Sequence, residues 1–332
     1  MIMHHERPCE GKFLLTGASG WFGRTALWEY EQHYGPGALR RDVIAFASCA
    51  KSIDFGSRYG PISALPLSSI TTIANPRGLI HLAFLTRDRL QHVDIDRYIT
   101  LNREIRHQIE HLICQYPQMP IITMSSGAAA ALDPSSIPDL GDDPYASLKR
   151  EEEALWRSHS QGRMALVFRV YAASGRFLKS PKLFALGDFV EKALAGQRIV
   201  INSRRLVVRS YVHVGTLMRL CWQLLRQPLP SGFAQIDACT NTLTLIELAE
   251  IISNIWKLPM PKHELDQSLG SDEYTADSSA FRELLQKYGL KSPELKEQIY
   301  DTALAFAEDP EALRHETDET RKILSNSHDI DT

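Results

Sequence analysis

The sequence predicts an α/β fold: a doubly wound parallel sheet with a smaller, mainly C-terminal α/β region. Up to Ala173, apolar strand-like runs alternate with helix-like stretches. Such alternation is typical of right-handed crossovers that place helices on both faces of one sheet. Beyond Ala173 the segments become shorter and surround a Pro-rich patch at 257–265, which indicates a second region of different construction.

Composition narrows the class of protein. The chain has 332 residues, of which 44% are hydrophobic and 23% charged, as in ordinary soluble globular proteins. Lys and Arg number 37 against 40 Asp and Glu, so charge gives no reason to expect nucleic acid or an anionic membrane as a partner. No apolar run approaches the roughly 20 residues of a membrane span, and the N-terminus is polar, so we expect a cytoplasmic protein without a signal peptide.

Cysteine usage agrees with this expectation. The five cysteines are scattered, odd in number and never in a CxxC: Cys9, Cys49, Cys114, Cys221 and Cys239. This pattern is typical of reduced thiols, and we expect neither disulfides nor a metal site.

The expected elements follow one another in a regular order. Strands are predicted at 12–18, 42–48, 78–84, 120–126 and 164–171, and helices at 21–33 and 95–116 and from Pro144 onward. In the second half, helices are predicted at 184–195, 214–226 and 243–257, with short strands at 198–201 and 234–239. A final helix is expected over 292–309, with Ser292 as N-cap and Pro293 at the first helical position.

A glycine-rich turn, TGASGWFGR, directly follows the first strand. Between a strand and a helix, this spacing is the context of a dinucleotide fingerprint. Gly17 would permit the tight turn, Gly20 the approach of a pyrophosphate and Gly23 close helix–strand packing. The helix N-terminus would then offer N–H donors and partial positive charge to the phosphates.

The segment PYASLKREEEAL raises the question of whether Tyr145 and Lys149 are solvated helix residues or an acid/base pair. Asp143 and Pro144 form an N-cap and first helical residue, so the two side chains lie one turn apart on one helix face. A tyrosine pKa near 10 makes a poor base, but an adjacent ammonium and an oxidised nicotinamide would lower it.

These features together resemble the extended short-chain dehydrogenase/reductases, in particular the NAD(P)-dependent nucleotide-sugar epimerase, dehydratase and reductase group. The resemblance runs from about Lys12 to Ala307 and implies a Rossmann-like fold. Its motifs, in chain order, are TGASGWFGR, IHLAF, Asn102, TMSSG, YASLK, FRVY, RSYVHV, TLTLIELAEII and DSSAFRELLQKYGL. It implies a dinucleotide-binding domain over 1–173, completed by about 212–240, a substrate-binding region over 174–211 and 241–310, and a flexible tail over 311–332.

The resemblance also assigns site residues. Ser126, Tyr145 and Lys149 take the catalytic places, with Ser126 preferred to Ser125. Ser126 and Arg209 are expected to contact the substrate, Arg209 through a sugar-nucleotide diphosphate that suits a guanidinium fork. The expected dinucleotide contacts are Gly17, Ser19, Gly20, Trp21, Phe22, Gly23, Ser48, Lys51, Leu82, Ala83, Asn102, Tyr145 and Lys149.

The end of the second strand favours NADP over NAD. An NAD site usually presents a carboxylate there, but this chain has Ala47, followed by Ser48 and, shortly after, Lys51. Arg24 could add positive charge, while Asp54 could still reach a ribose.

Several positions depart from the family pattern. Gly127 and Ala128 stand where 4,6-dehydratases carry an Asp-Glu pair, so that reaction is disfavoured. Ala172 replaces a ligand-contacting asparagine, and Gly215 and Thr216 replace the acidic residues that often follow the RSYVHV element.

The interpretation is therefore a reductase or epimerase of a nucleotide-activated sugar, with a net reductase slightly favoured by the expected NADP. A homodimer is expected through a four-helix bundle that includes 95–116 and the Tyr145 helix. The alternative is a non-catalytic member that binds a dinucleotide and acts as a regulator or scaffold. An RNA-binding relative is disfavoured, because the composition provides no basic face.

Overall fold

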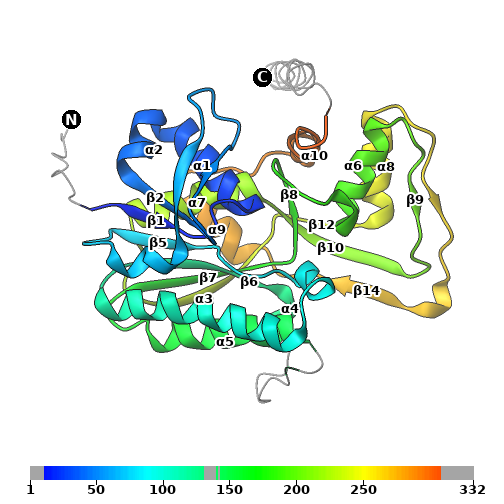
Figure 1. The fold of residues 1–332 in the computed structure, drawn as a ribbon. Coiled ribbons are helices and arrows are strands. Elements are labelled where there is room, and N and C mark those ends of the chain that lie inside the picture. The colour runs from blue at the N-terminus through cyan, green and yellow to red at the C-terminus, as the bar shows by residue number, and fades with distance from the viewer. Residues whose placement is uncertain (1–10, 131–139, 141–142, 308–332) are drawn as a thin grey trace. The chain divides into compact units, whose positions relative to one another are not determined.

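The computed structural model describes residues 11–130, 140 and 143–307 (Figure 1). It divides into two compact units, one within Met1–Arg169 and Met218–Ile236, the other within Val170–Leu217 and Asp237–Thr332. Cys9 and the tail expected over 311–332 lie outside the described residues.

An eight-stranded sheet forms the first unit, in the order β11-β7-β6-β5-β1-β2-β4-β3. Strand β1 pairs in parallel with β2 on one side and with β5 on the other, whereas β3 pairs with β4 in the antiparallel direction. The strands are β1 Phe13–Leu15, β2 Val43–Ala47, β3 Lys51–Ile53, β4 Ile62–Pro66, β5 Gly78–His81, β6 Ile121–Ser126, β7 Met164–Val170 and β11 Gly232–Ala238. The predicted doubly wound α/β fold is confirmed.

Helices cover both faces of this sheet. Figure 1 shows α3 (Ile95–Gln115) and α5 (Pro144–Ser158) below the sheet and α1 (Trp21–Tyr34) above it. In the chain, the short helix α2 (Pro36–Asp42) precedes β2, and the short helix α4 (Gly127–Ala130) follows β6. Helix α7 (Val214–Arg226) packs against α1. There the Trp222 indole N–H donates to the Ala26 carbonyl at 2.8 Å.

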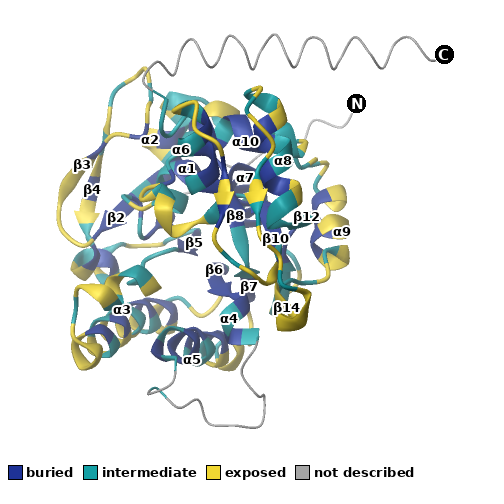
Figure 2. Cartoon of the chain, turned by 90° about the vertical axis from the view of Figure 1, so that its right-hand side faces the viewer, coloured by how far each residue is buried: buried dark blue, intermediate teal, exposed yellow. Residues whose placement is uncertain are grey.

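Apolar side chains explain why these elements associate. Strands β1, β5 and β6 are buried along their whole lengths, as parallel strands covered on both faces should be. One face of the sheet packs Phe46, Leu79 and Ile121 against Ile109 of α3 and Trp156 of α5. In Figure 2, α3 and α5 lie below β5 and β6, and α3 carries both buried, dark blue segments and exposed, yellow ones.

The second unit is built on the long strand β10 (Leu206–His213), which pairs with β8 (Ala172–Ser174), β12 (Asn241–Thr244) and β14 (Ser271–Tyr274). A two-stranded sheet joins β9 (Val200–Ile201) and β13 (Lys262–His263). Its helices are α6 (Ala185–Leu194), α8 (Leu245–Ile255), α9 (Ser279–Lys287) and α10 (Leu295–Ala303). Helices α6, α8 and α10 share one apolar core.

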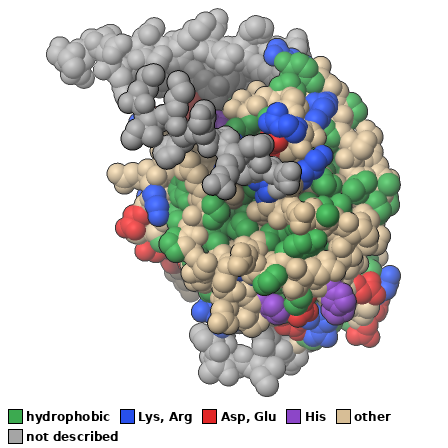
Figure 3. Space-filling view, turned by 90° about the vertical axis from the view of Figure 1, so that its left-hand side faces the viewer, with side chains coloured by type: hydrophobic (Ala, Val, Ile, Leu, Met, Phe, Trp, Pro, Cys, Tyr) green, Lys and Arg blue, Asp and Glu red, His purple; other side chains and the backbone are tan. Residues whose placement is uncertain are grey.

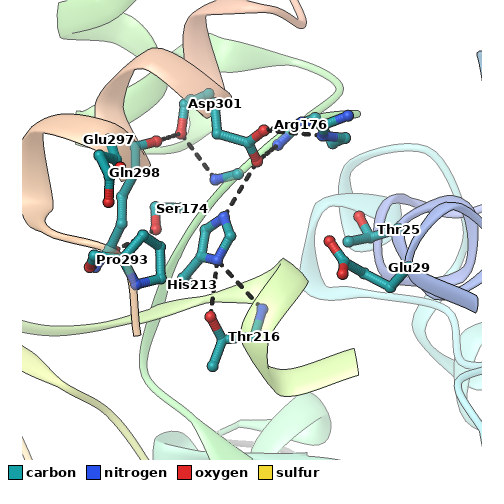
Figure 4. Close-up of polar contacts among 12 residues, drawn as sticks. Thr25, Glu29, Ser174, Arg176, His213, Thr216, Pro293, Glu297, Gln298 and Asp301 are labelled. Atoms are coloured by element: carbon teal, nitrogen blue, oxygen red, sulfur yellow. Dashed lines mark hydrogen bonds and ion pairs between the residues drawn. The ribbon is translucent and has the colours of Figure 1, made fainter. Parts of the chain in front are cut away.

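A polar network ties α10 to the strands of this unit (Figure 4). The Asp301 carboxylate accepts from the Arg176 backbone N–H at 2.9 Å and from its Nε at 2.8 Å, and lies 3.1 Å from Nε2 of His213. The other ring nitrogen of His213 lies 3.0 Å from the Thr216 hydroxyl. The polar side chains of this cluster are therefore paired with one another.

The sequence predictions differ from the structure in several places. In the second unit, the long strand β10 and its partners β8, β12 and β14 were not among the predicted strands, and neither was β13. Between Tyr34 and Arg77, only the strand at 42–48 was predicted, whereas the chain also forms α2, β3 and β4. The predicted N-cap Ser292 is wrong: α10 begins at Leu295 after Glu294, which forms a capping box with Glu297. The Ser292 hydroxyl instead lies 3.4 Å from the amide nitrogen of Gln298.

Candidate active site

The glycine turn between β1 and α1 shows why two of its glycines are required. Gly17 has φ +67°, and a Cβ there would lie 2.6 Å from the backbone of Leu82. A Cβ on Gly23 would lie 2.2 Å from the Gly17 carbonyl oxygen. Both positions therefore need glycine for the protein's own packing, as the sequence predicted.

Gly20 is different, because its own packing does not demand a glycine. A Cβ there would meet only the Gly17 carbonyl oxygen, at 3.2 Å. Gly20 is the N-cap of α1, no side chain caps this helix start, and its first turn has no acidic residue. The positive end of the α1 dipole therefore meets no acidic side chain from its own first turn, so this turn fits the pyrophosphate of a dinucleotide.

The loop after β5 is held against the glycine turn. The Thr16 hydroxyl oxygen accepts from the backbone N–H of Leu82 at 3.0 Å and of Ala83 at 3.1 Å. Asn102, on α3, accepts from the Leu85 N–H at 2.8 Å through its amide oxygen. The predicted cofactor residues Leu82, Ala83 and Asn102 therefore make hydrogen bonds that hold this loop in place.

The end of β2 carries the residues expected to read the adenosine ribose. Ser48 and Lys51 are both exposed there. The Asp54 carboxylate accepts from the Gly56 N–H at 2.9 Å, so it closes a local turn. Arg24 is half-buried beside the glycine turn, and its Nε has no partner among residues 11–130, 140 and 143–307.

Helix α5 starts as predicted and brings Tyr145 to Ser126. Asp143 is the N-cap, its carboxylate accepting from the Ala146 N–H at 3.0 Å, and Pro144 follows it. Hydrogen bonding to Ser126, at the carboxyl end of β6, lowers the pKa of Tyr145. Ser125 points elsewhere, donating to Glu153 at 2.6 Å, which agrees with the choice of Ser126.

The surroundings of Tyr145 correct one expectation. Its ring stands edge-on to Phe84, with centroids 5.8 Å apart, and the Arg87 guanidinium lies 5.1 Å from its centroid. Burial raises the pKa of Tyr145 above its ordinary value, and this outweighs the lowering by Ser126 and Arg87. The protein's own groups thus raise this pKa, and the lowering expected from Lys149 together with an oxidised nicotinamide stays a prediction.

Lys149 shows a partner that the sequence analysis missed. Its buried ammonium donates to a Glu152 carboxylate oxygen and to the Met124 carbonyl, both at 2.9 Å, and lies 3.6 Å from the Phe84 ring centroid. Nε2 of His81 lies 3.7 Å from the other Glu152 oxygen. The i, i+3 spacing of Lys149 and Glu152 was the available signal, since such residues share a helix face.

The three consecutive glutamates of α5 have separate partners. Glu151 pairs with two arginines of α3, Arg103 and Arg106, at 2.6 and 2.5 Å. Glu153 receives a two-pronged contact from Arg169 at 2.8 and 2.7 Å. A short acidic run therefore holds α5 to α3 and to β7, and supplies the carboxylate beside Lys149.

Arg209 lies in the second unit, whereas Ser126, Tyr145 and Lys149 lie together in the first. The Arg209 guanidinium contacts the carboxylate of Asp272 at 2.9 Å and the Asp272 and Val208 carbonyl oxygens at 2.8 and 2.9 Å. The Arg209 guanidinium is thus bound by protein groups, and a substrate diphosphate would have to displace the Asp272 carboxylate to bind it.

The surface charge is mixed where it is displayed. Figure 3 shows acidic and histidine side chains beside basic ones near its lower edge. Within the described residues, no helix is both long and apolar enough to span a bilayer.

Several solved structures share this fold at low sequence identity, which establishes the architecture alone. The UDP-glucose 4-epimerase of Thermotoga maritima, solved with UDP-glucose, is 18% identical, with TM-score 0.66 over 89% of this chain and 98% of that one. The ADP-L-glycero-D-manno-heptose-6-epimerase of Helicobacter pylori is 13% identical, with TM-score 0.67 over 88% and 94%. MoeE5 in complex with UDP-glucose and NAD is 16% identical, with TM-score 0.64 over 88% and 97%.

No curated protein matches the chain. The family comparison does match, over residues 13–232, which is more than half of the 332 residues. This span contains the glycine turn, the Ser126 strand end and the helix of Tyr145 and Lys149. The chain therefore belongs to the NAD dependent epimerase/dehydratase family, and its Rossmann-like α/β fold is that of the extended short-chain dehydrogenase/reductases.

Proposed function

We propose that the protein is an NAD(P)-dependent reductase or epimerase of a nucleotide-activated sugar. The observation that carries this proposal is the placement of Tyr145, at the start of α5, near Ser126, at the end of β6, in the same unit as the glycine turn. Family membership supports it, as do the similar structures solved with UDP-glucose.

The chain's own residues would divide the work as follows. A bound dinucleotide supplies hydride-transfer chemistry. The Gly20 turn and the first N–H groups of α1 would hold its phosphates. The Ser126 hydroxyl would donate a hydrogen bond to the substrate oxygen, and the Tyr145 phenol would give that oxygen its proton. In an epimerase, Tyr145 would first take a proton from a sugar hydroxyl and later return it.

A dehydratase would need more than this set. Eliminating water from the sugar requires an acid and a base near the reacting carbons. After Ser126 the chain continues as Gly-Ala-Ala-Ala in α4, which offers no titratable side chain. We therefore propose a reductase or epimerase and not a 4,6-dehydratase.

We propose NADP as the preferred dinucleotide. Support comes from the end of β2, because residues 47–51 include no carboxylate. The nearby Asp54 carboxylate accepts a hydrogen bond from the Gly56 N–H. A 2′-phosphate there would meet cationic and hydroxyl groups and no repelling charge. We further propose a homodimer through α3 and α5, which light scattering would test.

Binding and chemistry call for separate experiments. Gentle unfolding of the purified protein followed by mass spectrometry identifies any retained nucleotide, and melting with NADPH or NADH ranks the two. Tyr145→Phe should keep the dinucleotide-dependent rise in melting temperature but lose turnover by about 100-fold or more. Tyr116→Phe is the matched control, since that hydroxyl bonds the Ile73 carbonyl at 3.0 Å outside the site. Protein stabilised by neither dinucleotide would contradict the proposal.

The second candidate is a non-catalytic member that binds a dinucleotide. The ion pair of Lys149 with Glu152 favours it, because a paired ammonium is less available to a ligand. In that case Tyr145→Phe would change neither binding nor the response to a substrate probe such as UDP-glucose.

A further inference from the structure

Glu152 is the one carboxylate that contacts Lys149 within the described residues. The Lys149 side chain is 8% exposed and the Glu152 side chain is 4% exposed. The Lys149 ammonium lies 2.9 Å from a Glu152 carboxylate oxygen. Both residues stand on α5, and the Met124 carbonyl of β6 holds the ammonium from the other side. This pair lies one helical turn beyond Tyr145.

The opposite charges of this pair compensate each other. Burial alone would raise the pKa of Glu152, but the Lys149 ammonium and the nearby His81 imidazole outweigh it and hold that pKa below its ordinary value. A buried carboxylate and ammonium at this distance present little net charge to their neighbours. Lys149 therefore offers Tyr145 much less cationic help than its sequence position suggests.

Other groups around Tyr145 do not replace that help completely. The Ser126 hydroxyl and the Arg87 guanidinium favour the phenolate, whereas Glu152 and Asp143 oppose it. Arg87 is itself paired with Asp143 at 2.5 Å, so its charge is also partly compensated. Tyr98, on α3, is the remaining titratable group that interacts with Tyr145.

We propose that Glu152 is a positioning residue that keeps the Lys149 ammonium paired and Tyr145 in its protonated form, setting the site to donate a proton during carbonyl reduction. This rests on the proposed function and deepens it toward the reductase. In that reaction a reduced nicotinamide dinucleotide is oxidised and delivers a hydride to the carbonyl carbon. The phenol O–H bond breaks, its proton goes to the carbonyl oxygen, and solvent then reprotonates the phenolate.

The test measures the protonation state of Tyr145 directly, in the full chain and without any dinucleotide. The protein is labelled with tyrosine carrying ¹³C at Cζ, whose chemical shift reports the phenolate, and Tyr145→Phe assigns the signal. In the wild-type chain, the titration midpoint of Tyr145 should lie above pH 10, the ordinary tyrosine value. In Glu152→Gln, the fraction of phenolate at a given pH should rise about tenfold, since Lys149 becomes an uncompensated neighbouring cation.

Glu151→Gln is the matched control. It makes the same substitution one residue away, in a side chain that pairs with Arg103 and Arg106, and it should titrate like the wild type. A Tyr145 signal that titrates below pH 10 in the wild-type chain would overturn the proposal, and this result needs no variant to fold. So would a folded Glu152→Gln that titrates like Glu151→Gln. Failure of the proposed function would instead appear as absent dinucleotide binding, which this titration does not involve.

Discussion

Replacing Asp301 by asparagine should destabilise the second unit more than any exposed charge replacement there. The Asp301 carboxylate, 13% exposed, accepts from the backbone and guanidinium of Arg176 and contacts His213. Asparagine keeps the shape but removes the charge, which leaves the Arg176 guanidinium, 19% exposed, without a counter-ion among these groups. Breaking a mostly buried pair costs about 3–5 kcal/mol, and the residual exposure argues for a loss of about 3 kcal/mol.

The loss should also depend on pH. Burial would raise the pKa of Asp301, but His213 and Arg176 outweigh it and hold that pKa far below the ordinary 3.8. A lowered carboxyl pKa gives stability that is complete above 3.8 and declines as the pH falls toward the folded-state value. The difference between wild type and Asp301→Asn should therefore be about 1 kcal/mol smaller near pH 3 than near pH 7.

Urea unfolding monitored by hydrogen exchange of α10 peptides measures this loss within the unit concerned. Asp266→Asn is the control, because Asp266 pairs with Arg204, a 66% exposed partner in the same unit, and no measurable change is expected. The reasoning is refuted by a loss at pH 7 no larger than that of Asp266→Asn, or by a loss that is the same near pH 3.

Three further variants test the glycine turn and the strand end. Gly23→Ala should lower the free energy of unfolding by about 1–3 kcal/mol in a denaturant titration, because its Cβ would meet the Gly17 carbonyl at 2.2 Å; an unchanged midpoint would refute the packing argument. Gly20→Val should melt somewhat below the wild type, because valine is a poor N-cap and its Cβ would lie 3.2 Å from the Gly17 carbonyl oxygen, and it should lose the dinucleotide-dependent rise in melting temperature; retention of that rise would contradict phosphate binding at this turn. Ser125→Ala should lose about 1–3 kcal/mol in stability, since Glu153 loses a 2.6 Å partner, yet keep its turnover; a selective loss of turnover would move the catalytic hydroxyl from Ser126 to Ser125.

The sequence alone was sufficient for six of the eight strands of the large sheet, the glycine turn and the start of α5. Each is a local property: strands buried on both faces are apolar throughout, a φ of +67° favours glycine, and Asp143 followed by Pro144 is a favourable helix start. The choice of Ser126 over Ser125 came from a family resemblance and agrees with the opposite orientations of neighbouring residues on a strand. The polar segment between Tyr34 and Arg77 was underpredicted because the edge strand β3 and its neighbour β4 are short and lack a continuous apolar run.

Only the tertiary structure decided the electrostatics of the site. Sequence spacing places Lys149 one turn from Tyr145, but it cannot show that the ammonium turns to Glu152 and Met124. Nor can it show that Asp272, from a strand 63 residues away, engages Arg209. Charge pairing and pKa depend on burial and on which distant segments of the chain come into contact. Both are consequences of packing and not of local sequence.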